Sequence, residues 1–191
     1  RTFVGKTIPT PLKNILKEWY WRNKVHYIKL PYEKKAICAL KGKKKIRVVF
    51  LALYKSVWKY DSLYQLMKAD ERFDPIVLVC PIVNYGVKHM LEQMEISFKH
   101  YKSLGYNVIS SYNKDSDTYI DLEKDLQPDI LFYTNPYKGL IDNRYYIDRF
   151  PHILTCYVPY GFNPVKFEWT YNLNFHNLLW RFFCETQITK E

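Results

Sequence analysis

Five short apolar runs, separated by segments with helical spacing, constrain the fold of this chain more than any other feature of its sequence. Each run has the length of one β-strand, and the first is rich in β-branched residues. Strands that alternate with helices form a parallel sheet joined by right-handed crossovers. The sequence therefore predicts an α/β fold of about five strands, which lie at residues 46–53, 76–80, 107–112, 129–134 and 153–158.

Helical spacing marks the segments between these strands. Residues 60–69 and 87–104 carry apolar side chains every three or four positions, and Gly105 ends the second helix. A small helix is predicted at 119–126. The spacing of five apolar residues near the end of the chain predicts a last amphipathic helix at 172–186.

The positive charge of the chain lies almost entirely at its beginning. Residues 1–47 contain 14 Lys and Arg against 2 acidic residues, a net charge of +12, whereas residues 48–191 contain 15 against 17, a net charge of −2. The main domain therefore lacks the basic cluster that a phosphate backbone requires, and we expect no nucleic-acid partner. The expected organisation is a basic helical extension at 1–45, a Rossmann-like α/β domain at 46–170 and a C-terminal helix at 171–191.

The N-terminal extension is expected to start with a basic amphipathic helix. Thr10 suits its N-cap and Pro11 its first helical position, and apolar residues then recur at helical spacing up to a Trp19-Tyr20-Trp21 cluster. Three interpretations stay open. The apolar stripe packs on the protein itself, the segment is a solvated lead-in, or it contacts an anionic membrane or an anionic polymer.

The four cysteines predict neither a disulfide framework nor a metal centre. They lie at positions 38, 80, 156 and 184, without a CxxC pair and without the spacing of metal ligands to histidine. We expect no metal and no cofactor. The sequence also has no run of 18 apolar residues and no signal-peptide pattern, so we expect a cytoplasmic protein.

Aromatic and polar residues follow the fourth and fifth predicted strands, where the apolar runs end at prolines. The carboxyl ends of parallel strands share one edge of the sheet, and ligands of α/β proteins bind at that edge. Phenol and amide groups there can stack on sugars or donate hydrogen bonds to hydroxyls and phosphates. The predicted substrate-binding residues are Asn135, Tyr137, Tyr157 and Gly161, beside Tyr160; the alternative is that the tyrosines only cap the core.

The loop after the first strand is a second candidate for ligand binding. It lacks the GxGxxG pattern, so a conventional dinucleotide site is not expected. Lys55 and Ser56 could hold a phosphate at the start of the following helix, or they could be plain solvent-facing residues. Of the five histidines, His176 is the candidate to face a ligand-binding cleft at this edge of the sheet. The alternative is that its side chain only caps its helix or packs on the core.

Four motifs of the sequence carry a resemblance to a known family. The motifs are Val57-Trp58-Lys59-Tyr60-Asp61, Gln127-Pro128-Asp129-Ile130 with Thr134-Asn135-Pro136-Tyr137, Leu154-Thr155-Cys156-Tyr157-Val158-Pro159-Tyr160-Gly161-Phe162, and Phe175-His176-Asn177-Leu178-Leu179-Trp180. On these motifs the chain, from about residue 46 onward, resembles the N-terminal half of bacterial CDP-glycerol glycerophosphotransferase-like proteins, which are associated with teichoic acid and surface polysaccharide biosynthesis.

The resemblance implies the two-domain architecture of GT-B glycosyltransferases. A second domain would bind most of the donor, such as CDP-glycerol, while this domain supplies the acceptor contacts and the catalytic base. Better-known members carry that base in a Trp-His-Gly motif, where this chain reads Pro159-Tyr160-Gly161. Tyr160 and His176 are therefore the catalytic candidates, and a tyrosine, with an ordinary pKa of about 10, is a weak base near neutral pH.

The expected function is that of the acceptor-side domain of a transferase. It would move glycerol phosphate or a sugar from a nucleotide-activated donor to a polymer or lipid-linked acceptor, and the domain alone would be inactive. Its expected location is the cytoplasm, with peripheral contact between residues 1–45 and the inner face of the cell membrane. The alternative is a non-catalytic α/β domain that binds a polysaccharide or a partner.

Overall fold

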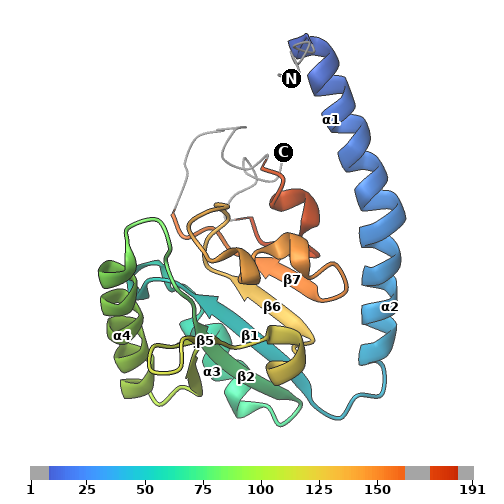
Figure 1. Ribbon diagram of the computed structural model, residues 1–191. Helices are drawn as coiled ribbons and strands as arrows, with labels where there is room; N and C mark the ends of the chain where they lie inside the picture. Colours follow the sequence, from blue (N-terminus) through green and yellow to red (C-terminus); the bar gives the residue numbers. More distant parts are fainter. Residues whose placement is uncertain (1–8, 162–172, 185–191) are drawn as a thin grey trace.

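A parallel β-sheet forms the centre of the computed structural model of this chain, in which residues 9–161 and 173–184 are described (Figure 1). Within these residues the sheet has six strands in the order β3-β2-β1-β6-β7-β8, and every neighbouring pair is parallel. The strands are β1 (Ile46–Ala52), β2 (Phe73–Val79), β3 (Val108–Ser110), β6 (Ile130–Tyr133), β7 (Leu154–Tyr157) and β8 (Arg181–Phe182).

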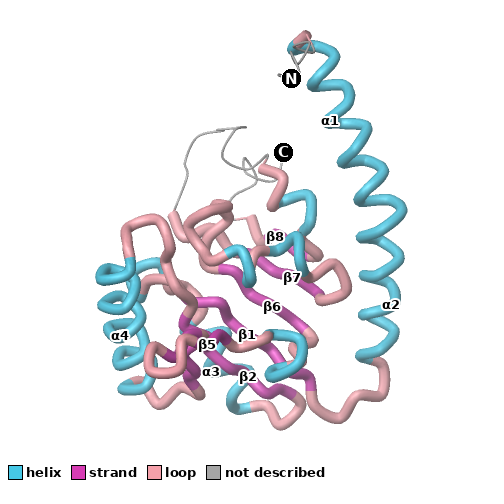
Figure 2. The backbone as a smooth tube through the Cα atoms, in the orientation of Figure 1, coloured by secondary structure: helices cyan, strands magenta, loops and turns pink. Residues whose placement is uncertain are grey.

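This order is that of a doubly wound Rossmann-like sheet. Counted along the chain within the sheet, the strands lie in the order 3-2-1-4-5-6, which reverses direction between β1 and β6. The predicted α/β fold with a parallel sheet is confirmed. All five predicted strands are present, and β8 is added at the edge of the sheet beside β7 (Figure 2).

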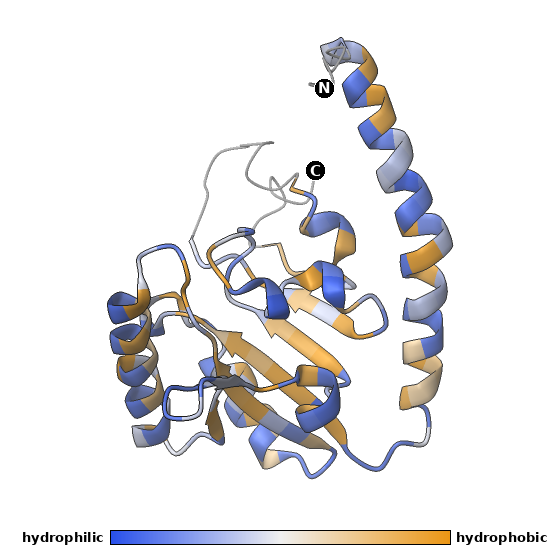
Figure 3. Ribbon diagram, viewed as in Figure 1, coloured by the Kyte–Doolittle hydropathy of each residue, from blue (hydrophilic) through white to orange (hydrophobic). Residues whose placement is uncertain are grey.

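The central strand, β1, explains why the sequence shows continuous apolar runs. Its side chains alternate between the two faces of the sheet, with Val48 and Phe50 on one face and Val49 and Leu51 on the other. All four are at most 1% exposed. A strand that is buried on both faces needs an apolar residue at every position, and Figure 3 shows these strands as hydrophobic.

The two faces of the sheet are covered by different kinds of structure. Helices α3 (Asp61–Ala69) and α4 (Val87–Ser103) pack on the face of Phe50. Short turns cover the other face, where Tyr145, Phe150 and Phe175 fill the core. These turns are η3 (Leu122–Leu126), η4 (Asn143–Tyr145), η5 (Ile147–Arg149) and η6 (His176–Leu178).

The predicted small helix at 119–126 is only partly correct. Its first residue, Tyr119, belongs to a two-stranded antiparallel hairpin of β4 (Tyr112–Asn113) and β5 (Thr118–Tyr119). The helical turn η3 begins after Asp121, whose side chain accepts hydrogen bonds from the backbone amides of the two residues at 123 and 124, both at 3.1 Å. The cap sets the start of the turn, which the apolar spacing alone did not locate.

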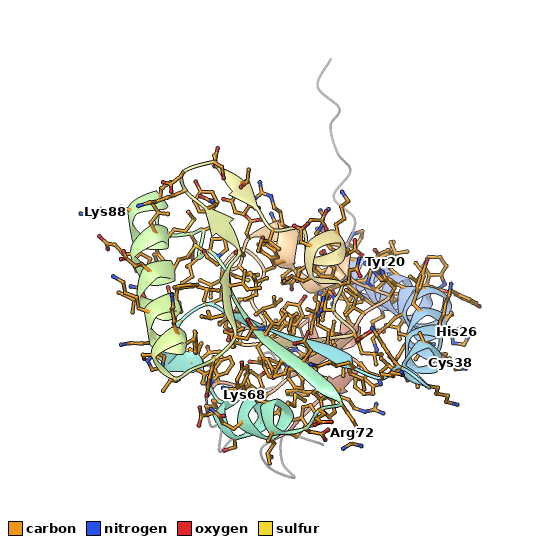
Figure 4. The ribbon with its side chains drawn as sticks, turned by 90° about the horizontal axis from the view of Figure 1, so that it is seen from below. Tyr20, His26, Cys38, Lys68, Arg72 and Lys88 are labelled. Atoms are coloured by element: carbon orange, nitrogen blue, oxygen red, sulfur yellow. The ribbon has the colours of Figure 1, made fainter. Side chains whose placement is uncertain are left out.

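The N-terminal segment forms one continuous helical rod beside the sheet. It consists of α1 (Thr10–Lys24), the π turn η1 (Val25–Lys29) and α2 (Leu30–Leu40), and Figure 4 labels Tyr20, His26 and Cys38 along it. Pro9, and not the expected Thr10, takes the N-cap position, so the rod begins at Thr10 itself. Trp21 of α1 and Ala36, Ile37 and Leu40 of α2 pack on the core while partly exposed, and neither helix contains a buried residue. Among the described residues, no helix is long and apolar enough to cross a bilayer.

The predicted helix at 172–186 is wrong over its described part, residues 173–184. This part forms η6 and then β8, so the sheet extends past the expected domain end at residue 170. The backbone amide of Trp180 donates to the Thr155 carbonyl at 2.8 Å, and that of Phe183 donates to the Tyr157 carbonyl at 3.0 Å. Pairing with the edge of β7 satisfies these amides, and aromatic residues suit a strand as well as a helix.

We predict that Tyr60→Phe destabilises the fold by about 1–3 kcal/mol. The Tyr60 side chain is 2% exposed; its hydroxyl donates to the Tyr133 carbonyl at 2.6 Å and accepts from the Val158 amide at 3.0 Å. Removing it leaves both backbone groups without that partner. Urea unfolding measures the loss, and Tyr27→Phe, at a position that is 69% exposed, is the control. Equal stability of the two variants would contradict this role.

Candidate functional site

A pocket of about 280 Å³ lies where the carboxyl end of β6 meets the N-terminal helix and the turns η5 and η6. We call it the Tyr137 pocket. Its volume is close to the lower end of the range for small-molecule sites, and it suits a group of the size of one sugar ring or one glycerol phosphate unit. Its lining residues are Trp21, Pro136, Tyr137, Lys138, Tyr146, Asp148, Leu173, Asn174 and Leu178.

Tyr137, which lines this pocket, and Tyr160, which does not, lie close to each other, as their positions after β6 and β7 predict. Their phenol groups interact, and each residue is 37% exposed. Partial burial, together with the neighbouring Tyr137 phenol, raises the pKa of Tyr160 to about 12. The phenol therefore keeps its proton at neutral pH and can donate a hydrogen bond, whereas it cannot serve as a base without a further change in its surroundings.

Tyr157 and Asn135 hold the two loops in place. Tyr157 is 3% exposed, and its hydroxyl interacts with the backbone amide of Tyr160. Asn135 is 8% exposed, and its Oδ1 accepts from the backbone amide of Tyr137 at 2.9 Å. Each residue fixes the backbone of one exposed tyrosine. The geometry thus favours a positioning role for both of these predicted substrate-binding residues.

His176 packs among aromatic residues of the core, next to β7 and β8. Its ring centroid is 5.9 Å from that of Tyr157 and 5.1 Å from that of Phe182. Its Nδ1 accepts from the backbone amide of Leu173 at 3.2 Å, and Leu173 lines the Tyr137 pocket. Burial lowers the pKa of His176 from 6.5 to about 4. The imidazole is therefore neutral at pH 7 and has little driving force to take up a proton.

Charged and aromatic groups that the sequence did not single out complete the pocket. Lys138 Nζ is 3.0 Å from Asp148 Oδ2 and 5.2 Å from the centroid of the Tyr146 ring. Trp21 reaches the pocket from α1. An aromatic wall, an ammonium and a carboxylate are the groups that bind hydroxyl-rich ligands. Trp21 is more than 100 residues away along the chain from the other lining residues, so the sequence alone did not place it in the pocket.

Lys55 and Ser56 lie on the same edge of the sheet but outside the pocket. Both are exposed on the 3-10 turn η2 (Lys55–Val57), and α3 starts later, with Asp61 in its first turn. A carboxylate in the first turn already interacts with the positive end of the helix dipole. Gly161 is exposed too, and a Cβ there would meet no atom within 4 Å among the described residues. Ligand binding at these three positions stays a prediction.

Two other pockets lie toward the opposite edge of the sheet, where β6 and β7 begin. One, of about 310 Å³, is lined by α2 and by Asp129, Glu123 and His152. The other, of about 440 Å³, contains Arg144 and Arg149 together with Glu123. Most of these charges are already paired, since Lys43 binds Asp129 and His152 binds Glu123. In the described ranges, no group of three His, Cys, Asp or Glu residues is arranged to hold a metal ion.

Comparisons with known proteins give this chain no relative. No family model, no curated protein and no solved structure shows significant similarity to it. The strand order and the pocket alone define the class of this protein. It is a Rossmann-like α/β protein with a small aromatic pocket at the carboxyl edge of its sheet. The resemblance to glycerophosphotransferases is supported only by the motifs quoted above.

We predict that His176 titrates with a midpoint near pH 4, well below its ordinary value of 6.5. Between these values the unfolded chain binds a proton that the folded protein does not bind, so the free energy of unfolding falls as the pH falls from 6.5 to 4. NMR titration of the ring protons gives the midpoint. In the variant His176→Asn, the Asn Oδ1 can replace Nδ1 as the hydrogen-bond acceptor. The urea midpoint of this variant should change less between pH 7 and pH 5 than that of the original chain. An equal change would contradict the low pKa of His176.

Proposed function

We propose that this chain is the acceptor-side domain of a transferase that moves glycerol phosphate or a sugar from a nucleotide-activated donor to a polymer or lipid-linked acceptor. The observation that carries the proposal is the convergence of the β6 and β7 loops, which brings the Tyr160 phenol close to Tyr137, a residue that lines the pocket. Such a pocket is wide enough for one polymer unit. Its position at the carboxyl edge of a Rossmann-like sheet is where α/β proteins bind ligands.

The chemistry of the pocket fits an acceptor with hydroxyl and phosphate groups. Tyr137 offers a phenol donor in the pocket and Tyr160 a second one beside Tyr137, while Trp21 and Tyr146 offer aromatic surfaces for an apolar face of the ligand. Lys138 offers a positive charge, although Asp148 already neutralises part of it. The donor, for example CDP-glycerol, would bind mainly to a second domain, as the resemblance implies.

A second candidate function, binding without catalysis, is favoured by the pKa values of the two catalytic candidates. Tyr160, with a pKa of about 12, is too protonated at neutral pH to act as a base. His176, with a pKa of about 4, is neutral but only weakly basic. An effective general base has a pKa close to the pH at which the enzyme works. In this alternative the same pocket recognises a polysaccharide or a partner.

We predict that Tyr137→Phe and Tyr160→Phe each weaken binding of a short synthetic poly(glycerol phosphate) about 2- to 10-fold. Each change removes one hydroxyl, whose hydrogen bond is worth about 0.5–1.5 kcal/mol. Isothermal titration calorimetry measures the affinity. Tyr85→Phe is the matched control, because Tyr85 is 62% exposed and does not line the pocket. Absence of binding by the unchanged protein, or an equal loss in the control, would reject the pocket as the acceptor site.

The transferase itself is tested by turnover in the entire natural polypeptide. With CDP-glycerol and the poly(glycerol phosphate) acceptor, we expect CMP release, with kcat reduced at least 10-fold by Tyr160→Phe if its hydroxyl contacts the reacting group. The same variant should keep its fold, as monitored by circular dichroism. Unchanged turnover together with weakened polymer affinity would support the binding function instead.

A further inference from the structure

Helix α1 exposes a continuous apolar stripe that nothing in the described part of the chain covers. Its members recur every three or four residues and therefore lie on one side of the helix. None of the 15 residues of α1 is buried. The stripe consists of Leu12, Ile15, Leu16 and Trp19, which are 48%, 62%, 47% and 65% exposed.

The stripe points away from the domain. Trp21 is the residue of α1 that packs on the core and lines the Tyr137 pocket, so it marks the side of the helix that faces the protein. At about 100° per residue, the centre of the stripe lies about 170° around the helix from Trp21. Of the three interpretations of this segment, packing of the stripe on its own domain is therefore wrong for the described residues.

The π turn η1 confirms which side of the rod faces the protein. A π turn contains an extra residue, which rotates the face of the following helix back by about 100°. With this rotation, Trp21 on α1 and the core-packing residues Ala36, Ile37 and Leu40 on α2 lie on the same side of the rod. Without the turn they would be about 100° apart. The turn thus lets one rod pack on the domain with a single face.

The polar side of α1 is basic. Lys13, Lys17, Arg22 and Lys24 oppose the single acidic residue Glu18 between positions 10 and 24. The rod continues this charge through Lys34 and Lys35 on α2, both of them exposed. A helix with apolar residues on one side, lysines and arginine around the rest and a Trp-Tyr pair at the boundary has the composition of an interfacial helix.

We propose that α1 lies in the surface of an anionic lipid bilayer, with Leu12, Ile15, Leu16 and Trp19 inserted among the acyl chains. The charge selects this occupant, because two copies of the stripe would bring two positive helices together, whereas anionic headgroups attract them. The Trp21 side of the helix then faces away from the lipid. The Tyr137 pocket would open about one helix diameter, roughly 10 Å, from the bilayer surface. This inference does not depend on the proposed function.

The experiment is co-sedimentation of the full chain with vesicles of phosphatidylcholine alone or with 30% phosphatidylglycerol, a composition of about one anionic lipid in three. We expect at least 10-fold tighter binding to the anionic vesicles, weakened by salt because surface charges are screened. Leu16→Glu should reduce this binding at least 10-fold. Glutamate is a good helix former, so circular dichroism should show an intact fold.

Leu66→Glu is the matched control, because Leu66 is 70% exposed on α3, outside the rod. It adds the same charge and should bind vesicles as the unchanged chain does. Equal binding by Leu16→Glu and Leu66→Glu would overturn the proposal. Equal binding to both kinds of vesicle would overturn it too. The proposal would also fail if the chain formed a dimer in light scattering that Leu16→Glu converted to a monomer, while neither form bound lipid. The stripe would then bind a second copy of the chain.

Discussion

The pairing of β1 with β2 on one side and β6 on the other is the constraint on which the rest of the structure depends. β1 is buried on both faces, so its backbone groups can be satisfied only by two neighbouring strands. The chain continues from β1 to β2 in one direction and returns to the other side with β6. The loops after β1 and β6 therefore diverge at the carboxyl edge, and the space between diverging loops is where a site can form.

Eight tyrosines of the described residues are buried, and this helps to decide which tyrosines are candidates for function. Tyr60, Tyr133 and Tyr145 are 1–2% exposed, and their hydroxyls bond to backbone carbonyls of distant segments. Buried loop segments have backbone carbonyl groups that need hydrogen-bond donors. The phenol groups of these tyrosines supply such donors inside the core. Tyr137 and Tyr160 differ, because each is 37% exposed and their phenol groups lie close to each other. A ligand hydroxyl could bind between the two phenols without leaving a backbone group unsatisfied.

The sheet was predictable from the sequence because strands buried on both faces leave uninterrupted apolar runs, such as residues 46–53. The approach of Tyr137 to Tyr160 was also predictable, since parallel strands end at one edge. What could not be predicted depends on long-range pairing. Residues 173–184 carry apolar positions that suit a helix, but the free edge of β7 provides backbone partners that turn the segment into β8. Trp21 joins the pocket through a π turn, for which the sequence has no signature.

The rod and the pocket are connected through a single residue. Trp21 lines the Tyr137 pocket, while the apolar stripe lies on the other side of the same helix, so α1 has one face for the domain and one for an external surface. If a bilayer covers the second face, the first face fixes the orientation of the pocket relative to that bilayer. A lipid-linked acceptor would then need to rise only about one helix diameter, roughly 10 Å, to reach the phenols. The same helix that locates the domain at a membrane would also form one wall of its binding site.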